Sequence, residues 1–232
     1  MPGYQVRTET LSLGGKDWHI RRLIDDQQYI DTHHHAADIG LPPAGWSHFG
    51  QVWPSSRVLA LAMLTHPIEG LRVLEIGAGL ALASLVMHRR GGDVTVSDWH
   101  PLTEEFLQYN LMLNGLGPIP YQAGNWESTA ATDNPALGRF DLIVGSDLLY
   151  ERQQPAQLAA FIFRHATPKA VVIIVDPDRG NRAAFGRDMA ALGFTLSMQT
   201  ADRQLEDGES YKGRFLSFTR QAAPLSSGTR NE

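Results

Sequence analysis

The sequence predicts an α/β protein built on a largely parallel β-sheet. From residue 71 onwards, short apolar runs alternate with segments of helical periodicity, which is the pattern of parallel strands joined by helical crossovers. The apolar runs are continuous, as expected for strands that are covered on both faces. The first run leads into Gly77 and Gly79, which is typical of a strand-to-helix turn that brings a ligand close to the backbone.

The first 50 residues predict an N-terminal β-hairpin and an irregular extension that pack on the core. Residues 5–24 form two alternating runs that meet at Gly14 and Gly15, a hairpin signal. Residues 31–52 are rich in His, Pro, Gly and Trp and predict an irregular segment. Within it, the run His33–His35 lacks the spacing of metal ligands, so we expect a solvated loop and no metal site.

The main domain is predicted to span residues 51–220. Pro54 sits in the first turn of a predicted helix over 53–64. Strands are then predicted at 71–76, 93–97, 140–146 and 170–176, and helices at 80–90, 101–114, 155–166 and 182–193. The runs 194–200 and 214–220 have no helix between them, which predicts an antiparallel closing pair. Residues 221–232 are small and polar and predict a disordered tail.

Composition argues against several classes of protein. The 20 basic and 25 acidic residues give a net charge of −5, which argues against a protein that grips a nucleic acid backbone. The absence of cysteine rules out thiol catalysis and suits a reducing compartment. The N-terminus lacks a signal-peptide pattern, and the apolar run 170–175 is far short of the ~20 residues that span a bilayer. We therefore expect a cytoplasmic, soluble protein with no membrane partner. We also expect a monomer.

Two nucleotide-binding patterns can be tested on the glycine loop. The dinucleotide pattern G-x-G-x-x-G/A places its last position on Leu82, which is too large for close contact between helix and strand. An acidic-x-G-x-G pattern fits instead, through Glu75, Gly77 and Gly79. A carboxylate there suits the cationic groups of S-adenosylmethionine, and the glycine amides at the helix N-terminus suit its carboxylate. A tight turn without a ligand remains the alternative.

The second strand supports a nucleotide site. It ends in Asp98, close to the spacing of about 20 residues expected for an acid that holds ribose hydroxyls. Trp99 could lie against an adenine and Trp126 offers a second aromatic wall, although either tryptophan could belong to the core. These residues follow successive strands, and ligands of open α/β sheets bind at that edge.

At this point the chain resembles the class I (seven-stranded) S-adenosylmethionine-dependent methyltransferases, and within them methyltransferase family 16, which includes protein-lysine methyltransferases. The resemblance covers about residues 50–220 and rests on "VWPSS" (52–56), "LEIGAG" (74–79), "VSDW" (96–99), "NW" (125–126) and "FDLIVGSDLLY" (140–150). It implies S-adenosylmethionine as cofactor and a sheet ordered 3-2-1-4-5-7-6 with strand 7 antiparallel. The predicted cofactor-binding residues are Trp53, Glu75, Gly77, Ala78, Gly79, Asp98, Trp99, Asn125, Trp126 and Ser146. The chain departs from the pattern at Ala81, where we expect one methyl group to tighten the loop only slightly.

The segment "SDLLY" matches the Asp-x-x-Tyr motif of that family as Asp147 and Tyr150, the predicted catalytic residues. A lysine amine has a pKa of about 10.4, so presenting it neutral at pH 7 costs roughly 4–5 kcal/mol. Asp147 and Tyr150 can accept the amine hydrogens and direct its lone pair at the methyl group. The alternative is that Asp147 caps the strand end and Tyr150 packs.

The function predicted is N-methylation of a lysine side chain in a protein. The alternative is a small-molecule amine or heterocycle N-methyltransferase. A non-catalytic nucleotide-binding module and a nucleic-acid base methyltransferase are weaker alternatives, since the latter's Asn/Asp-Pro-Pro-Tyr tetrapeptide resembles "DLLY" but both prolines are absent. An open groove beside Tyr150 would favour a protein acceptor, and a closed lid from 31–52 a metabolite. The acidic turn at 176–182 could touch substrate, but we expect it only to cap a helix.

Overall fold

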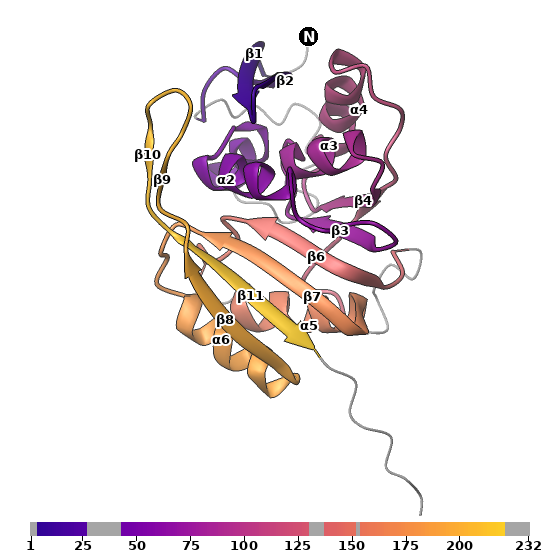
Figure 1. Cartoon of the computed structure of the whole chain (residues 1–232), viewed down its shortest axis with the longest axis vertical. Helices are drawn as coiled ribbons and strands as arrows, with labels where there is room; N and C mark the ends of the chain where they lie inside the picture. Colours follow the sequence, from indigo (N-terminus) through magenta and orange to yellow (C-terminus); the bar gives the residue numbers. More distant parts are fainter. Residues whose placement is uncertain (1–3, 27–42, 130–136, 152–153, 221–232) are drawn as a thin grey trace, which may run out of the picture.

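The computed structural model describes residues 4–26, 43–129, 137–151 and 154–220, and in this part of the chain a central sheet is covered by helices on both faces (Figure 1). The sheet has seven strands: β3 (Arg72–Ile76), β4 (Asp93–Asp98), β5 (Tyr121–Ala123), β6 (Phe140–Ser146), β7 (Ala166–Asp176), β8 (Phe194–Thr200) and β11 (Arg214–Arg220). The helices are η1 (Pro43–Gly50, a 3-10 helix), α2 (Pro54–Met63), α3 (Leu82–Arg89), α4 (Thr103–Leu113), α5 (Gln154–His165) and α6 (Arg182–Ala191). Two further pairs of strands are β1 (Val6–Leu13) with β2 (Lys16–Leu23), and β9 (Arg203–Gln204) with β10 (Ser210–Tyr211).

The order of the sheet is β5-β4-β3-β6-β7-β11-β8. Strands β3 to β7 pair in parallel, whereas β11 runs antiparallel to both β7 and β8. In order along the chain this is the predicted arrangement 3-2-1-4-5-7-6 with strand 7 antiparallel, so the predicted fold class is confirmed. The chain order reverses between β3 and β6, and open α/β sheets bind their ligands at such a switch point.

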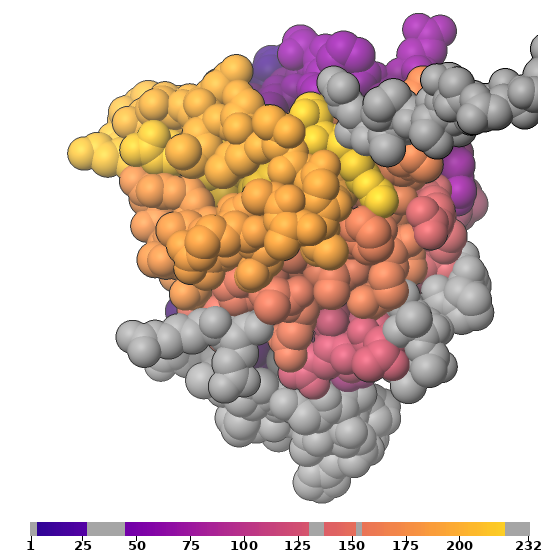
Figure 2. All heavy atoms as spheres, turned by 90° about the horizontal axis from the view of Figure 1, so that it is seen from below, coloured from indigo at the N-terminus to yellow at the C-terminus, as the bar shows by residue number. Residues whose placement is uncertain are grey.

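Alternate residues of the central strands bury against opposite layers, which explains the continuous apolar runs in the sequence. On β7, Ile173 and Val175 join a core with α2, α3 and α4. Val172 and Ile174 join a second core with α5 and α6. The C-terminal half of the chain dominates the surface seen from below (Figure 2).

The N-terminal hairpin turns at the predicted glycines and packs beside the first core. Gly14 and Gly15 both have positive φ angles, as a type I′ turn requires. The buried side chains of the hairpin, such as Trp18, contact the layer that contains α2. Strand β2 is also tied to α4, because the side chains of Asn110 and Asn114 accept hydrogen bonds from its backbone amides at 2.7 and 3.0 Å. These side chains cover an edge that would otherwise be open for pairing.

The structure differs from the predicted element ranges in four places. The short strand β5 had no predicted bounds. Strand β7 begins at Ala166 rather than 170, since β6 and β7 already pair at Phe140 and Ala166 before an irregularity in their register. The short β9 and β10 pair lies between β8 and β11, and no prediction covered it. Part of the segment predicted as irregular forms η1. The His33–His35 run, the rest of the predicted extension and the tail at 221–232 lie outside the described residues.

Candidate active site

A cavity of about 680 Å³ opens at the edge of the sheet where the parallel strands end. Ligand pockets of small molecules commonly measure about 300–1,000 Å³, so the volume fits one such ligand. The loops after β3, β4, β5, β6 and β7 all contribute to its wall, together with η1, the start of α2 and Gln157 of α5.

The cavity gathers almost the whole predicted site. The predicted residues in its lining are Trp53, Gly77, Ala78, Gly79, Asp98, Trp99, Asn125, Trp126, Ser146, Asp147 and Tyr150. Glu75 lies outside the lining. Asp147 and Tyr150 therefore share one cavity with the residues predicted to bind a cofactor.

The glycine loop after β3 requires left-handed backbone at three positions. Gly77 and Gly79 each have a φ of 53°, and Ala81 has a φ of 56°. A side chain on Gly79 would also meet the carbonyl oxygen of Phe49 at 2.8 Å, so the loop and η1 approach closely only because this residue is glycine. Ala81 is fully buried in the left-handed conformation. The departure from glycine at that position therefore strains the backbone, which our expectation of a slight tightening did not foresee.

Glu75 stabilises the loop from beneath. Its carboxylate is buried and accepts a hydrogen bond from the Ser84 amide, in the first turn of α3, at 2.7 Å. Burial raises the pKa of Glu75 to about 7, because removal from water disfavours the charged form. From this position the Glu75 carboxylate caps α3. It does not line the cavity, so its position does not support the predicted contact with a cationic ligand.

Asp98 connects the ends of β3 and β4. Its Oδ2 accepts the Gly79 amide at 2.8 Å and its Oδ1 accepts the His100 amide at 2.7 Å. Burial raises the pKa of Asp98, and the amides that donate to it oppose the rise. The amide of Gly79 is thus not open to an anionic ligand, contrary to our expectation. Each carboxylate oxygen keeps acceptor capacity for a further donor such as a hydroxyl group.

Aromatic side chains form much of the remaining wall. Trp53 donates its indole N–H to the His48 carbonyl at 2.8 Å, and the His48 ring stands edge-on to both Trp53 and Tyr150. Trp126 lies beside Gly77, where an added Cβ would be 3.2 Å from its ring. His48 and Phe49 also line the cavity but were not predicted, because their segment shows no periodicity.

Asp147 is held in an unusual conformation at the end of β6. Its φ of 58° is left-handed, and its amide donates to the Val175 carbonyl on β7 at 2.9 Å. Such strain is concentrated at functional sites in proteins. Tyr150, three residues on, is 44% exposed, so the cavity beside it is open to solvent.

Arg179 also contributes to the cavity and was not among the predicted site residues. Its Nε donates to Oδ1 of Asp147 at 2.7 Å, and it lines the cavity. The buried Asp176 carboxylate accepts the Arg179 amide at 3.0 Å and so shapes the turn that carries the arginine. Burial raises the pKa of Asp176 to about 6. The turn at 176–182 therefore does more than cap α6. The feature of the sequence that could have indicated Arg179 is an arginine three residues after the acid that ends a strand.

Metal binding and membrane insertion find no basis in the described residues. Within the described ranges, no three His, Asp or Glu side chains are grouped so that they could hold a metal ion. None of the helices described is both long and apolar enough to cross a membrane.

Comparison with known proteins gives one consistent result. Residues 44–185 match a family model described as lysine methyltransferase. The chain is 28% identical over 130 residues to magnesium-protoporphyrin O-methyltransferase of Rhodobacter capsulatus, covering 56% of this chain and 55% of the relative. It is 26% identical over 161 residues to protein N-lysine methyltransferase METTL21A of Xenopus tropicalis, covering 66% and 73%. The chain thus spans only about half the length of the first of these relatives.

Among solved structures, the chain is similar to a ribosomal protein L11 methylase from Lactobacillus delbrueckii subsp. bulgaricus. The TM-score is 0.54 at 20% identity, and the match covers 72% of this chain and 79% of the other. At this identity the likeness concerns the fold alone.

Proposed function

Since the chain belongs to the lysine methyltransferase family, we propose that it transfers a methyl group from S-adenosylmethionine to the side-chain nitrogen of a lysine in a protein. The observation that carries the proposal is the single cavity that unites the glycine loop, Asp98 and the Asp147–Tyr150 pair at the switch point of the sheet. A binding module would need the first two features, but not an acid and a phenol beside them.

The residues of the cavity fit S-adenosylmethionine. Asp98 would hold its ribose hydroxyls with the acceptor capacity that its two backbone partners leave. Trp53, Trp99 and Trp126 would provide apolar walls. Among the described residues that line the cavity, four are acidic and one is an arginine: Asp98, Glu127, Asp147, Glu151 and Arg179. This excess of negative charge favours a ligand that carries a sulfonium group.

The acceptor side can hold a neutral amine in position. When bound, S-adenosylmethionine supplies an electrophilic methyl group. Asp147 retains Oδ2 and part of Oδ1 as acceptors, although Arg179 occupies one direction. Tyr150 adds a phenol oxygen at the solvent-exposed side. Two acceptors that bind the amine hydrogens leave its lone pair directed at the methyl group, and this orientation is the chemical task of the site.

A protein acceptor is favoured over a metabolite by the exposure of Tyr150, which is 44%. A lysine side chain on a protein surface can reach such an open mouth, whereas a small molecule is usually enclosed by its enzyme. The relative named as an O-methyltransferase acts on a small molecule, and this keeps the metabolite acceptor as the second candidate. We further propose that the chain binds no nucleic acid, in line with its net charge of −5, and that it is cytoplasmic, in line with the absence of cysteine. A monomeric state is part of the same proposal.

The test is to incubate the protein with methyl-labelled cofactor and a cell lysate depleted of its own methylation. Label should enter the protein fraction and appear as methyllysine after hydrolysis. Label that enters only small molecules would move the proposal to the second candidate. No S-adenosylhomocysteine, despite cofactor binding in a calorimeter, would leave a non-catalytic module.

A further inference from the structure

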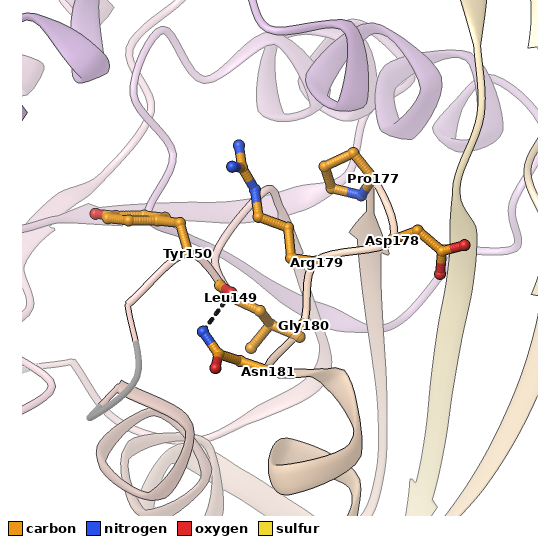
Figure 3. A pocket seen from close by; sticks show the side chains of 7 residues that line it. All are labelled: Leu149, Tyr150, Pro177, Asp178, Arg179, Gly180 and Asn181. Atoms are coloured by element: carbon orange, nitrogen blue, oxygen red, sulfur yellow. Dashed lines mark hydrogen bonds between the residues drawn. The ribbon is translucent and has the colours of Figure 1, made fainter.

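A second pocket lies directly beside the candidate active site. It measures about 470 Å³ and is lined by Leu149, Tyr150 and residues 177–181 (Figure 3). Tyr150 and Arg179 line both cavities, so these two side chains form the boundary between them. Among the described residues that line either cavity, Arg179 is the one lysine or arginine.

The guanidinium group of Arg179 is fixed at one edge and exposed at the other. Its Nε is hydrogen-bonded to Asp147, and the side chain of Arg179 is 40% exposed while that of Asp147 is 11% exposed. In Figure 3 the guanidinium projects away from its loop on the side of Tyr150, and the Asp178 carboxylate points away from it. Asp178 is paired instead with Arg182 and Arg214. The terminal nitrogens of Arg179 have no hydrogen-bond partner within the described part of the chain.

The turn that carries Arg179 is anchored on both sides. The Asp176 carboxylate binds the Arg179 amide, and the Asn181 side chain donates to the Leu149 carbonyl at 2.9 Å. A guanidinium held by its Nε and its backbone loses little further freedom when it binds a second anion. Its planar pair of terminal nitrogens matches a carboxylate in bidentate geometry.

We propose that the second pocket recognises an acidic side chain next to the methylated lysine, and that Arg179 is the specificity-determining residue that binds its carboxylate. The inference rests on the proposed function and adds the class of acceptor to it, a lysine with a neighbouring Asp or Glu. Asp147 in the larger cavity binds the lysine amine, and Arg179 at the boundary binds the carboxylate of the neighbouring Asp or Glu. An amine on Asp147 and a carboxylate on the outer edge of the guanidinium would lie about 7–9 Å apart by hydrogen-bond lengths. An acid two residues from the lysine in an extended peptide lies on the same side, about 6.6–7.2 Å along the chain, and the length of the side chains covers the remainder.

The test uses capped peptides with a central lysine and, two residues away, Glu, Gln or Lys. For the full chain with saturating cofactor, we expect kcat/KM for the Glu peptide to exceed that for the Gln peptide about tenfold. Arg179→Gln should abolish this preference without changing cofactor affinity, and Arg179→Glu should favour the Lys peptide. Arg187→Gln removes the same charge from the exposed face of α6 and serves as the matched control. A further peptide ends in Glu and is left uncapped at its C-terminus. It tests whether the free α-carboxylate of a chain terminus serves as the anion.

Three results would overturn the inference. The first is equal kcat/KM for the Glu and Gln peptides with the wild-type chain. The second is an equal loss of kcat for every peptide in Arg179→Gln, which would mean that the arginine only positions Asp147. The third result applies if the peptides are not turned over. Their binding to the chain saturated with S-adenosylhomocysteine is then measured by fluorescence polarisation, and equal affinity for the Glu and Gln peptides would overturn the inference. Labelling of lysate proteins would remain in each case, so failure of the inference is distinguishable from failure of the proposed function.

Discussion

Replacing Asp98 by asparagine tests the link that this residue makes between the loops after β3 and β4 in the cofactor cavity. The carboxylate accepts one amide with each oxygen, from Gly79 and from His100. Asparagine offers one oxygen and one NH₂ group, so one of these amides would face another donor. A ribose hydroxyl would lose its acceptor at the same oxygen. A hydrogen bond to a charged group contributes about 1.5–3 kcal/mol, so cofactor affinity should fall about 10- to 150-fold.

The fold should suffer less than the affinity. Burial raises the pKa of Asp98, which means that the folded chain already opposes the charge that asparagine removes. The assay is isothermal calorimetry with S-adenosylmethionine beside urea unfolding of each variant. Asp93→Asn, at the exposed opposite end of β4, is the control and should bind like the wild type. Unchanged affinity in a folded Asp98→Asn chain would refute the role of Asp98 in cofactor binding.

Three further substitutions address the loop above β3. Glu75→Gln should flatten the dependence of stability on pH: because burial raises the pKa of Glu75 to about 7, wild-type stability is full below about pH 4.5 and falls as pH rises through 7, by up to about 3 kcal/mol. Melting temperatures of both chains at pH 5.5 and 8.5 measure this. A difference between the two pH values in Glu75→Gln as large as in the wild type would contradict the assignment. Ala81→Gly relieves about 1–2 kcal/mol of left-handed strain against about 0.4–1 kcal/mol of chain entropy and about 0.8 kcal/mol for the buried methyl group, so the urea midpoint should change little; a large fall would contradict the strain. Gly79→Ala should cost about 2 kcal/mol more than Gly91→Ala, because both have positive φ angles but only the former meets the Phe49 carbonyl; equal costs would show that η1 does not constrain the loop.

Most helices and strands could be predicted because their signals are local. Continuous apolar strands, helical periodicity and the pair Gly14–Gly15 are each visible within a short window of sequence. The strand order of the sheet came from the resemblance to a family, since pairing between distant strands leaves no such local mark. The β9 and β10 pair has strands of two residues each, too short for alternation to be seen.

The candidate site was predictable in its position but not in its hydrogen bonds. Residues that follow successive parallel strands meet at one edge, so Asp98 and Trp126 could be grouped with the glycine loop from the residues alone, whereas Asp147 was assigned from the family motif. The partners of Glu75 could not be foreseen, because the acidic-x-G-x-G pattern fixes its place and leaves its direction open. The contact of Arg179 with Asp147 joins residues 32 positions apart on neighbouring strand ends, and only the turn set by the buried acid before it creates that contact.

The most direct test of methyl transfer at this strand end is the turnover of Asp147→Asn measured beside its cofactor affinity. Asparagine keeps an oxygen for the Arg179 Nε, so the turn should be retained, but it removes the charge and turns one acceptor of amine hydrogens into a donor. We expect S-adenosylmethionine to bind about as tightly as to the wild type, while labelling of lysate protein at saturating cofactor falls about 10²- to 10³-fold. Labelling at the wild-type rate would mean that Asp147 only caps β6, and the assignment of the acceptor site would be withdrawn.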